Sequence, residues 1–184
     1  MIRVLDLLLS SVLLLLFSPI MIGVAIALRL DSPGKVIFKQ TRVGRALRPF
    51  SIYKFRSMVD NADRIGGYST GKGDARVTKV GGFIRKTSLD ELPQLLNVLR
   101  GEMSLVGPRP DVPDQEAIYT PENWIKRHHV RPGITGLAQA TVRSTATPEE
   151  RTKLDLKYVD TVSLGQDMRI LAQTVRQILV RGSH

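Results

Sequence analysis

The sequence predicts a mainly helical α+β fold that opens with a membrane-associated helix. The first observation is a stretch without charged side chains that extends from Leu7 to Leu28. The second is a pair of short segments rich in β-branched and aromatic residues, 36–38 and 50–55, which predict a small β-hairpin. The third is a set of leucines in 92–99 that recur every three or four residues and predict a helix. At 184 residues, the chain is long enough for the membrane segment and one domain of ordinary size.

The uncharged stretch is long enough to cross a bilayer, because at ~1.5 Å per helical residue it matches a hydrocarbon core of ~30 Å. One interpretation is a cleavable signal peptide, since Arg3 precedes the stretch and residues 25–27 (AIA) resemble a cleavage site. The many Lys and Arg residues from Arg29 to Arg56 argue against this interpretation, because strongly basic stretches are retained in the cytoplasm.

A proline lies near the middle of the uncharged stretch. Pro19 removes a backbone donor and clashes with the preceding turn, so we expect the helix to bend or break there. The Ser18 hydroxyl is expected to bond a carbonyl that the proline leaves without its donor. The residues alone leave two arrangements open: a kinked helix that spans the bilayer, and a re-entrant helix–break–helix whose two basic ends both lie on the cytoplasmic face.

The charge balance and the absence of cysteine narrow the function. Lys and Arg number 27 against 17 Asp and Glu, which gives a formal net charge of +10. This charge predicts an anionic partner, namely nucleic acid, an anionic membrane surface or a phosphorylated small molecule. No zinc-finger or RNP pattern supports a nucleic-acid interface. The chain has no cysteine, which excludes disulfides, a thiolate zinc site and a cysteine nucleophile.

Turn signals divide the rest of the chain. A basic turn at 42–45 is expected to join the two strands, and the polar, glycine-rich residues 61–74 are expected to form a loop. The leucine-containing helix ends at Gly101, and Thr147 is expected to cap a helix that begins at Pro148.

The last predicted helix has two interpretations. Its apolar residues are Met168, Leu171, Val175 and Ile178, with arginines elsewhere on the helix. Packing against the core explains this pattern, and so does an amphipathic helix that lies on an anionic membrane. Residues 182–184 (GSH) are interpreted as the start of an expression tag.

The strongest local feature is a pair of adjacent carboxylates, Asp90 and Glu91, just before the leucine-containing helix. A helix N-terminus favours anions and lowers carboxylate pKa values, so Asp90 is expected to be ionised and available as a nucleophile or metal ligand. The alternative is a capping box, in which the Glu91 side chain reaches back to the Ser88 amide. From this segment alone the capping box is the better explanation.

Several cations on rigid turns shift the balance towards a functional site. Lys54 and Arg56 end a predicted strand, and Arg85 shortly precedes the acid pair. Arg109 and Arg131 stand in proline-containing turns, where a planar guanidinium suits phosphate. An acid pair beside such cations suggests a pyrophosphate site that needs a divalent ion, because Mg²⁺ is held by carboxylates together with substrate phosphates.

At this point the sequence resembles a known family. The matching segments are KFRSM (54–58), SLDELPQ (88–94), NVL (97–99), GEMS (101–104), GPRP (107–110) and RPGITGLAQ (131–139). In order and spacing they are similar to the bacterial sugar transferases, the monotopic polyprenyl-phosphate phosphoglycosyl transferases. The resemblance extends from the apolar N-terminus to about Arg181, and the chain resembles the minimal catalytic unit of the family.

The resemblance implies a monotopic membrane protein with a re-entrant helix over residues 1–30, broken at Ser18-Pro19, and amphipathic helices at the interface. It implies a catalytic domain over 31–181 on the cytoplasmic face of the bacterial inner membrane. The implied reaction transfers a phospho-sugar from a UDP-sugar to polyprenyl (undecaprenyl) phosphate and initiates polysaccharide or other glycoconjugate assembly. A homodimer is compatible with the sequence, and nucleic acid is not an expected partner.

The resemblance also implies roles for the site residues. Asp90 would attack the β-phosphorus, release UMP and carry the phosphosugar until polyprenyl phosphate accepts it. Glu91 would complete the catalytic pair, and both carboxylates would hold Mg²⁺. The substrate-binding cations would be Lys54, Arg56, Arg85, Arg109, Arg131 and Arg143.

One segment departs from the family pattern. Many members continue Gly-Leu-Ala-Gln with Val-Asn-Gly-Arg, where this chain has Ala140, Thr141, Val142 and Arg143. The arginine is kept but the flexible Asn-Gly is lost, so we expect 141–147 to bear on which sugar is accepted. A competing hypothesis from another class is a membrane-anchored module that binds an anionic ligand without turnover. The intact acid pair argues against that hypothesis.

Overall fold

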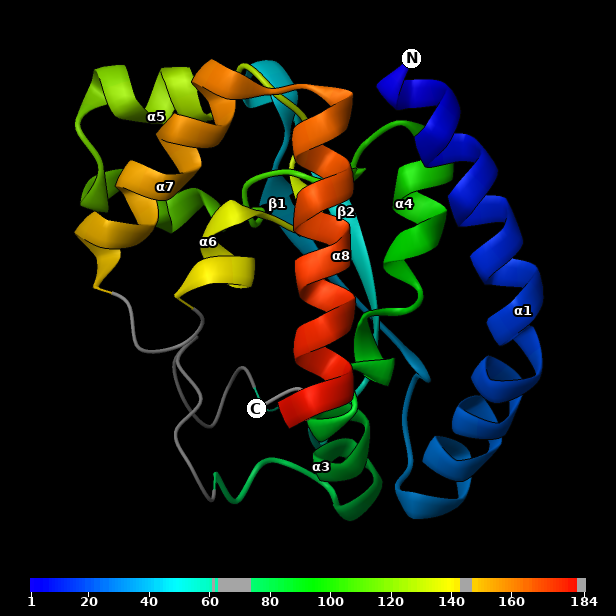
Figure 1. Cartoon of the computed structure of the whole chain (residues 1–184). Helices are drawn as coiled ribbons and strands as arrows, with labels where there is room; N and C mark the ends of the chain where they lie inside the picture. Colours follow the sequence, from blue (N-terminus) through cyan, green and yellow to red (C-terminus); the bar gives the residue numbers. More distant parts are fainter. Residues whose placement is uncertain (61, 63–73, 143–146, 182–184) are drawn as a thin grey trace.

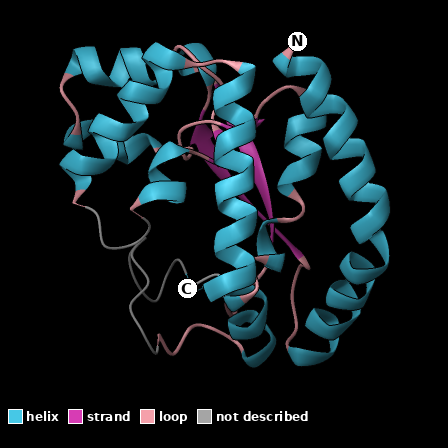
Figure 2. Cartoon of the chain, in the orientation of Figure 1, coloured by secondary structure: helices cyan, strands magenta, loops and turns pink. Residues whose placement is uncertain are grey.

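The computed structural model describes residues 1–60, 62, 74–142 and 147–181, with no side-chain description beyond residue 177. The described residues are mostly helical, as predicted, with two small sheets (Figure 2). The helices are α1 (Ile2–Asp31), α3 (Lys79–Lys86), α4 (Gln94–Arg100), α5 (Pro121–Arg127), α6 (Leu137–Thr141), α7 (Pro148–Thr161) and α8 (Leu164–Arg181). The strands are β1 (Ile37–Val43), β2 (Pro49–Phe55), β3 (Ser104–Val106) and β4 (Gly133–Thr135), and three 3-10 turns are η1 (Arg45–Leu47), η2 (Leu89–Glu91) and η3 (Pro113–Ile118).

The predicted β-hairpin is confirmed. Strands β1 and β2 pair antiparallel, with Gln40 opposite Ile52 and Phe38 opposite Lys54. Directly opposed residues of an antiparallel pair point to the same side, and side chains alternate along each strand. Gln40, Arg42 and Lys54 therefore share one face of the hairpin.

A second, parallel pair of short strands was not predicted from the sequence. It joins β3 to β4 and brings the turns at 107–110 and 131–133 together. The Gly107 amide donates to the Thr135 carbonyl, and the Gly133 amide donates to the Pro108 carbonyl, each at 2.9 Å. A Cβ atom on Gly107 would lie 2.4 Å from the Arg131 carbonyl oxygen, so only glycine permits this approach.

Helix α1 is continuous, so the expected break at Ser18-Pro19 is wrong. Pro19 lies inside one uninterrupted helix, which bows around the domain (Figure 1). The expected role of Ser18 is confirmed, because its hydroxyl donates to the Leu15 carbonyl at 2.8 Å. Leu15 is the residue whose carbonyl would otherwise receive the amide that Pro19 lacks. The hydroxyl therefore supplies the Leu15 carbonyl with the donor that Pro19 lacks, and the helix continues past the proline.

Both ends of α1 are attached to the same domain. Near its N-terminus, Arg3 donates to the Val98 carbonyl at 2.7 Å, and the buried Asp6 accepts from the Leu105 amide at 3.0 Å. At its C-terminus, the Arg56 guanidinium donates to the Ser32 carbonyl at 2.7 Å. One face of α1 therefore contacts the domain near each end of the helix.

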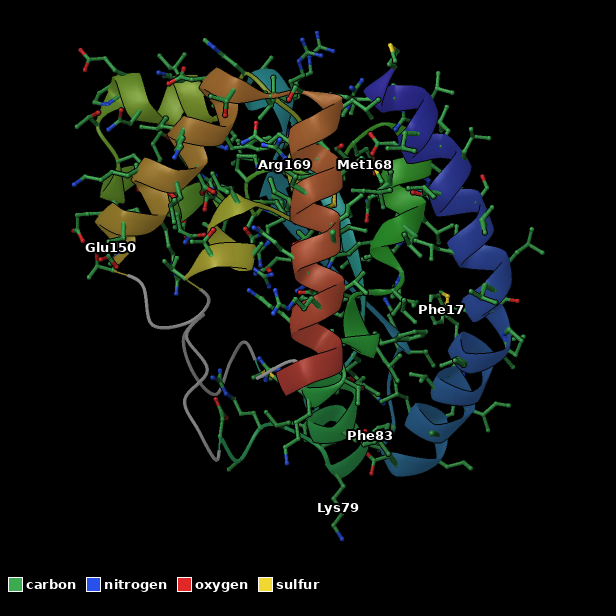
Figure 3. All side chains as sticks on the ribbon, viewed as in Figure 1. Phe17, Lys79, Phe83, Glu150, Met168 and Arg169 are labelled. Carbon is green, nitrogen blue, oxygen red and sulfur yellow. The ribbon has the colours of Figure 1, made fainter. Side chains whose placement is uncertain are left out.

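The other face of α1 is apolar and exposed. Side chains project away from the domain along the helix (Figure 3), and exposed large residues there include Val4, Leu8, Val12, Leu15, Leu16, Ile22, Ile26 and Leu30. Phe83 of α3 is also exposed and lies at the same end of the molecule as the last turns of α1 (Figure 3). Among the described residues, α1 is the one helix whose length and composition suit a membrane, which makes membrane association plausible.

Helix α4 lies between α1 and β2 (Figure 1). It ends at Gly101 in the left-handed conformation, as predicted, but its buried face differs from the leucine pattern. Leu95 is buried and Leu96 is exposed, whereas the polar Asn97 is fully buried. The Asn97 carboxamide accepts from the Tyr53 amide at 3.0 Å and donates to the Ser51 carbonyl at 2.8 Å, which fixes α4 against the edge of β2.

Thr147 caps α7 as expected, accepting a hydrogen bond from the Glu150 amide. On α8, the interpretation as core packing holds for Leu171, which packs against the buried cluster, but not for Met168 and Val175, which are exposed. Ile170 is the buried residue of this helix in that cluster. The expected loop at 61–74 lies outside the described residues except at its residues 62 and 74.

Candidate active site

The acid pair lies in the 3-10 turn η2, immediately before α4, and does not form the capping box. Ser88 adopts a left-handed conformation (φ 55°) and its side chain caps nothing. The Glu91 carboxylate instead accepts from the Lys54 ammonium at 2.8 Å and from the Arg109 guanidinium at 3.0 Å. The alternative that the sequence favoured for this segment is therefore wrong, and Glu91 belongs to a charged cluster.

The two carboxylates have opposite electrostatic environments. Burial acts to raise the pKa of Glu91, but Arg109 and Lys54 outweigh it and lower that pKa to about 2. Burial and the neighbouring Glu91 charge raise the pKa of Asp90 to about 6, against the opposing effect of Lys54, Arg85 and Arg109. The expectation that the helix N-terminus lowers the Asp90 pKa is wrong here, because burial and the adjacent carboxylate dominate.

Because their pKa values differ, the two carboxylates have different roles. Glu91 remains ionised and fixes the two cations, whereas Asp90 is half-buried and carries no ion pair among the described residues. Neighbouring carboxylates whose environments push their pKa values apart are typical of sites that transfer protons or groups.

Three of the six predicted cations gather at this pair. Lys54 comes from β2, and its burial and the nearby Arg109 lower its pKa, although Glu91 opposes this. Arg109 comes from the turn at 107–110. Arg85 comes from α3 and lies close enough to oppose the rise of the Asp90 pKa. Arg143 lies outside the described residues.

Arg56 and Arg131 were assigned to substrate from the sequence, and the structure places them elsewhere. Arg56 is buried, and its guanidinium donates to carbonyls at the C-terminal end of α1, namely those of Leu28, Ser32 and Pro33. Arg131 donates to the Gly101 carbonyl at 2.8 Å, beyond the C-terminus of α4 and so at the opposite end of that helix from the acid pair. Both side chains therefore donate to backbone carbonyls at or just beyond the C-terminal end of a helix.

Arg127 is a residue that sequence reasoning missed. It is buried between the carboxylates of Asp111 and Asp155, and its third contact is the Arg109 carbonyl at 2.7 Å. Arg127 therefore fixes the backbone of the turn that presents Arg109 to Glu91. Its segment carries no recognisable motif, so no local signal in the sequence identifies this role.

Arg42 was also missed, since the sequence predicts only a basic turn there. It lines a cavity of about 10 Å³, roughly the size of one water, whose walls are Arg42, Ile52, Lys54, Gln94, Arg109 and Pro110. The alternation of side chains along β1 is the signal that could have found it, because it places Arg42 on the same face as Lys54.

Whether the acid pair can hold Mg²⁺ depends on which side-chain atoms are available as ligands. Among the described residues, no group of three or more His, Cys, Asp or Glu side chains is placed to hold a metal ion. Mg²⁺ is commonly held by one or two carboxylates and completes its coordination with water and substrate phosphates. Asp90 and Glu91 provide carboxylate oxygens of this kind, so the residues fit an ion that arrives with a phosphate substrate.

The fold and the site together define a class of protein: a small domain attached to an apolar helix, with an acid pair set among cations that suit phosphate. The chain belongs to the bacterial sugar transferase family, whose family model matches residues 1–181.

Relatives of known name agree with this membership. The chain is 44% identical to a UDP-N-acetylgalactosamine-undecaprenyl-phosphate N-acetylgalactosaminephosphotransferase of Aeromonas hydrophila, over 96% of this chain and 43% of the relative. It is 42% identical to a UDP-glucose:undecaprenyl-phosphate glucose-1-phosphate transferase of Caulobacter vibrioides, over 96% of this chain and 69% of the relative. It is 46% identical to the uncharacterized sugar transferase EpsL of Bacillus subtilis, over 97% and 87%. The chain thus spans less than half of the Aeromonas protein and most of the other two.

Proposed function

We propose that the protein transfers a sugar phosphate from a UDP-sugar to undecaprenyl phosphate. The observation that carries the proposal is the acid pair, in which Lys54 and Arg109 hold Glu91 while Asp90 carries no ion pair among the described residues. A site that only bound anions would gain nothing from two carboxylates among its cations. The names of the Aeromonas and Caulobacter relatives describe this reaction with two different sugars.

The proposed chemistry proceeds in two displacements at one phosphorus. An Asp90 carboxylate oxygen attacks the β-phosphorus of the UDP-sugar, the bond from that phosphorus to the bridging oxygen breaks, and UMP leaves with the electron pair. An oxygen of undecaprenyl phosphate then attacks the same phosphorus and releases the Asp90 carboxylate. Lys54, Arg85 and Arg109 stabilise the negative charge that the phosphoryl oxygens carry.

The acid pair is also the proposed Mg²⁺ site. Asp90 and Glu91 would hold the ion together with substrate phosphate oxygens. When bound, Mg²⁺ supplies positive charge that neutralises the transferring phosphoryl group.

The proposed location is the cytoplasmic face of the inner membrane, with both ends of the continuous helix α1 on that face. The support is the attachment of both ends of α1 to one domain, through Arg3 at one end and Arg56 at the other. A helix that crossed the bilayer would place its ends on opposite sides. Because the chain has no cysteine, single cysteines at Ile2, Leu30 and Lys153 can be labelled one at a time in intact cells. Protection of all three from an impermeant reagent is expected, and labelling of Ile2→Cys alone would show that the two ends of α1 lie on opposite sides of the membrane.

The function is tested by UMP release from a panel of UDP-sugars, with Mg²⁺ and undecaprenyl phosphate, in nanodiscs. We expect Asp90→Asn to abolish release and to prevent a phosphosugar adduct detectable by mass spectrometry. Asp114→Asn, which alters an exposed acid of η3, should leave both unchanged. An active Asp90→Asn variant would remove Asp90 as the nucleophile. UDP-sugar binding without turnover or adduct would instead favour the binding module.

A further inference from the structure

Arg42 stands beside the acid pair but has no role in the proposed mechanism. It lies on β1, on the same hairpin face as Lys54, and lines the same small cavity as Lys54 and Arg109. Three cations from β1, β2 and the turn at 107–110 therefore converge on one point next to Glu91.

The contacts of Arg42 distinguish it from the other two cations. Its guanidinium donates from Nη1 to the Pro110 carbonyl at 2.9 Å and from Nη2 to the Gln40 carboxamide oxygen at 2.6 Å. Its Nε is buried and has no hydrogen-bond partner among the described residues. Lys54 and Arg109 already share the Glu91 carboxylate, whereas both oxygens that Arg42 contacts are neutral.

This arrangement is unfavourable unless an anion joins it. Burial and the nearby positive charge of Arg109 lower the pKa of Arg42 to about 10. The charges of Asp111 and Glu91 oppose this shift, but among the described residues neither carboxylate accepts a hydrogen bond from Arg42. The buried Nε donor without an acceptor raises the free energy of the folded state. A phosphate oxygen would supply the missing acceptor, and the planar guanidinium suits it.

Resting on the proposed function, we propose that Arg42 is a further substrate-binding residue, which donates from its buried Nε to a substrate phosphate oxygen. The diphosphate of the nucleotide sugar and the phosphate of the polyprenyl acceptor share this chemistry. Glu91 supplies one negative charge against the two cations Lys54 and Arg109, so together with Arg42 the cluster keeps a net positive charge that favours an incoming anion.

The test is calorimetric titration of the solubilised protein with UDP and, separately, with a short-chain polyprenyl phosphate. We expect Arg42→Met to weaken binding of one or both on the order of tenfold to hundredfold, the usual value of a hydrogen bond to a charged group. Arg48→Met, at the exposed hairpin tip, is the matched control and should bind both as wild type does. A loss confined to one ligand identifies which phosphate Arg42 contacts.

A double-mutant cycle separates direct contact from an effect on Arg109, because Arg42 also holds the Pro110 carbonyl. If Arg42 touches substrate, adding Arg42→Met to Arg109→Met should weaken binding further. No further loss would overturn direct contact. If Arg42→Met fails to fold, Arg42→Gln takes its place, and wild-type affinity of that variant for both ligands would overturn the inference.

The outcomes also distinguish the inference from the function on which it rests. If the Arg42→Met variant binds both ligands as tightly as wild type does, the role of Arg42 is overturned and the proposed function stays intact. A wild-type protein that binds neither ligand and releases no UMP would overturn the proposed function, and the role of Arg42 with it.

Discussion

Lys54 and Arg56 lie two residues apart at the end of β2, yet they belong to different regions of the molecule. Lys54 lies in the acid-pair region, where its ammonium binds the Glu91 carboxylate. Arg56 lies in the α1 region, where its guanidinium binds carbonyls at the C-terminus of that helix. Neighbouring cations of one motif can therefore have unrelated roles, and the acceptor that each one contacts tells them apart.

The same difference holds beyond this pair. Around the acid pair, Arg109 binds a carboxylate side chain. Arg3 and Arg131 bind backbone carbonyls at the C-terminus of α4. Helix C-termini carry partial negative charge and four carbonyls without intrahelical partners, so they attract cations as a substrate phosphate does. Assigning every arginine near a helix end to a ligand therefore overestimates the number of ligand-binding residues.

Arg127 binds both kinds of acceptor, the carboxylates of Asp111 and Asp155 and a backbone carbonyl. Its replacement should have the largest effect on stability. Arg127→Met leaves Asp111 and Asp155 buried without their cation, which is expected to lower the free energy of unfolding by about 3–5 kcal/mol. Chemical denaturation in detergent measures this change. Lys126→Met, which removes an exposed ion pair with Asp160, is the matched control and should change it by less than ~1 kcal/mol. Equal effects of the two variants would show that the buried network contributes little.

Arg56→Met should destabilise the protein without removing a group from the acid pair. It leaves carbonyls at the end of α1 without donors, and we expect a loss of about 2 kcal/mol in the free energy of unfolding. At temperatures where the variant is folded, UMP release should keep its wild-type KM for the UDP-sugar. Arg29→Met, whose exposed guanidinium makes one carbonyl contact, should cost less. A raised KM for the UDP-sugar with an unchanged free energy of unfolding would instead indicate that Arg56 binds substrate.

Much of the architecture could be predicted from local patterns. The apolar helix, the hairpin, the role of the Ser18 hydroxyl and the Thr147 cap each depend on residues close together in the sequence. The break at Pro19 was not correctly predicted, since α1 is continuous through the proline and the Ser18 hydroxyl bonds the Leu15 carbonyl there. The parallel pairing of β3 with β4 depends on a contact between distant segments, which periodicity does not reveal.

The candidate site was predicted in part for the same reason. Asp90, Glu91, Lys54 and Arg109 stand in segments rich in chemical signals, and the structure brings them together. The roles of other residues depend on which distant part of the chain the fold brings into contact with them. Arg42 and Arg127 meet residues remote in sequence, as do the misassigned Arg56 and Arg131, so their local sequence could not distinguish structural from substrate-binding cations.

Lys54→Met is the counterpart of Arg56→Met and should reverse its pattern. Removing the ammonium leaves Glu91 with Arg109 alone and removes a cation from the phosphate, so UMP release should fall on the order of tenfold to hundredfold, or ~1.4–2.7 kcal/mol in activation free energy. Lys39→Met is the control, because Lys39 lies on the opposite face of the hairpin over the Tyr53 ring. Its rate should match wild type. If the two variants lost activity equally, general positive charge rather than position would explain the effect.

Arg131→Met should have the smallest effect, and it tests the assignment of helix-end arginines most directly. Within the described part of the chain, this side chain makes one hydrogen bond, to the Gly101 carbonyl, and Arg3 also contacts carbonyls at this end of α4. We therefore expect a loss of about 1 kcal/mol in the free energy of unfolding and unchanged kcat and KM for UMP release. Arg109→Met, assayed beside it, should lose activity because its cation binds Glu91 itself. A strong rise in KM for Arg131→Met would mean that an arginine can bind a helix-end carbonyl and also reach substrate. The acceptor that a cation contacts would then no longer tell structural cations from substrate-binding ones.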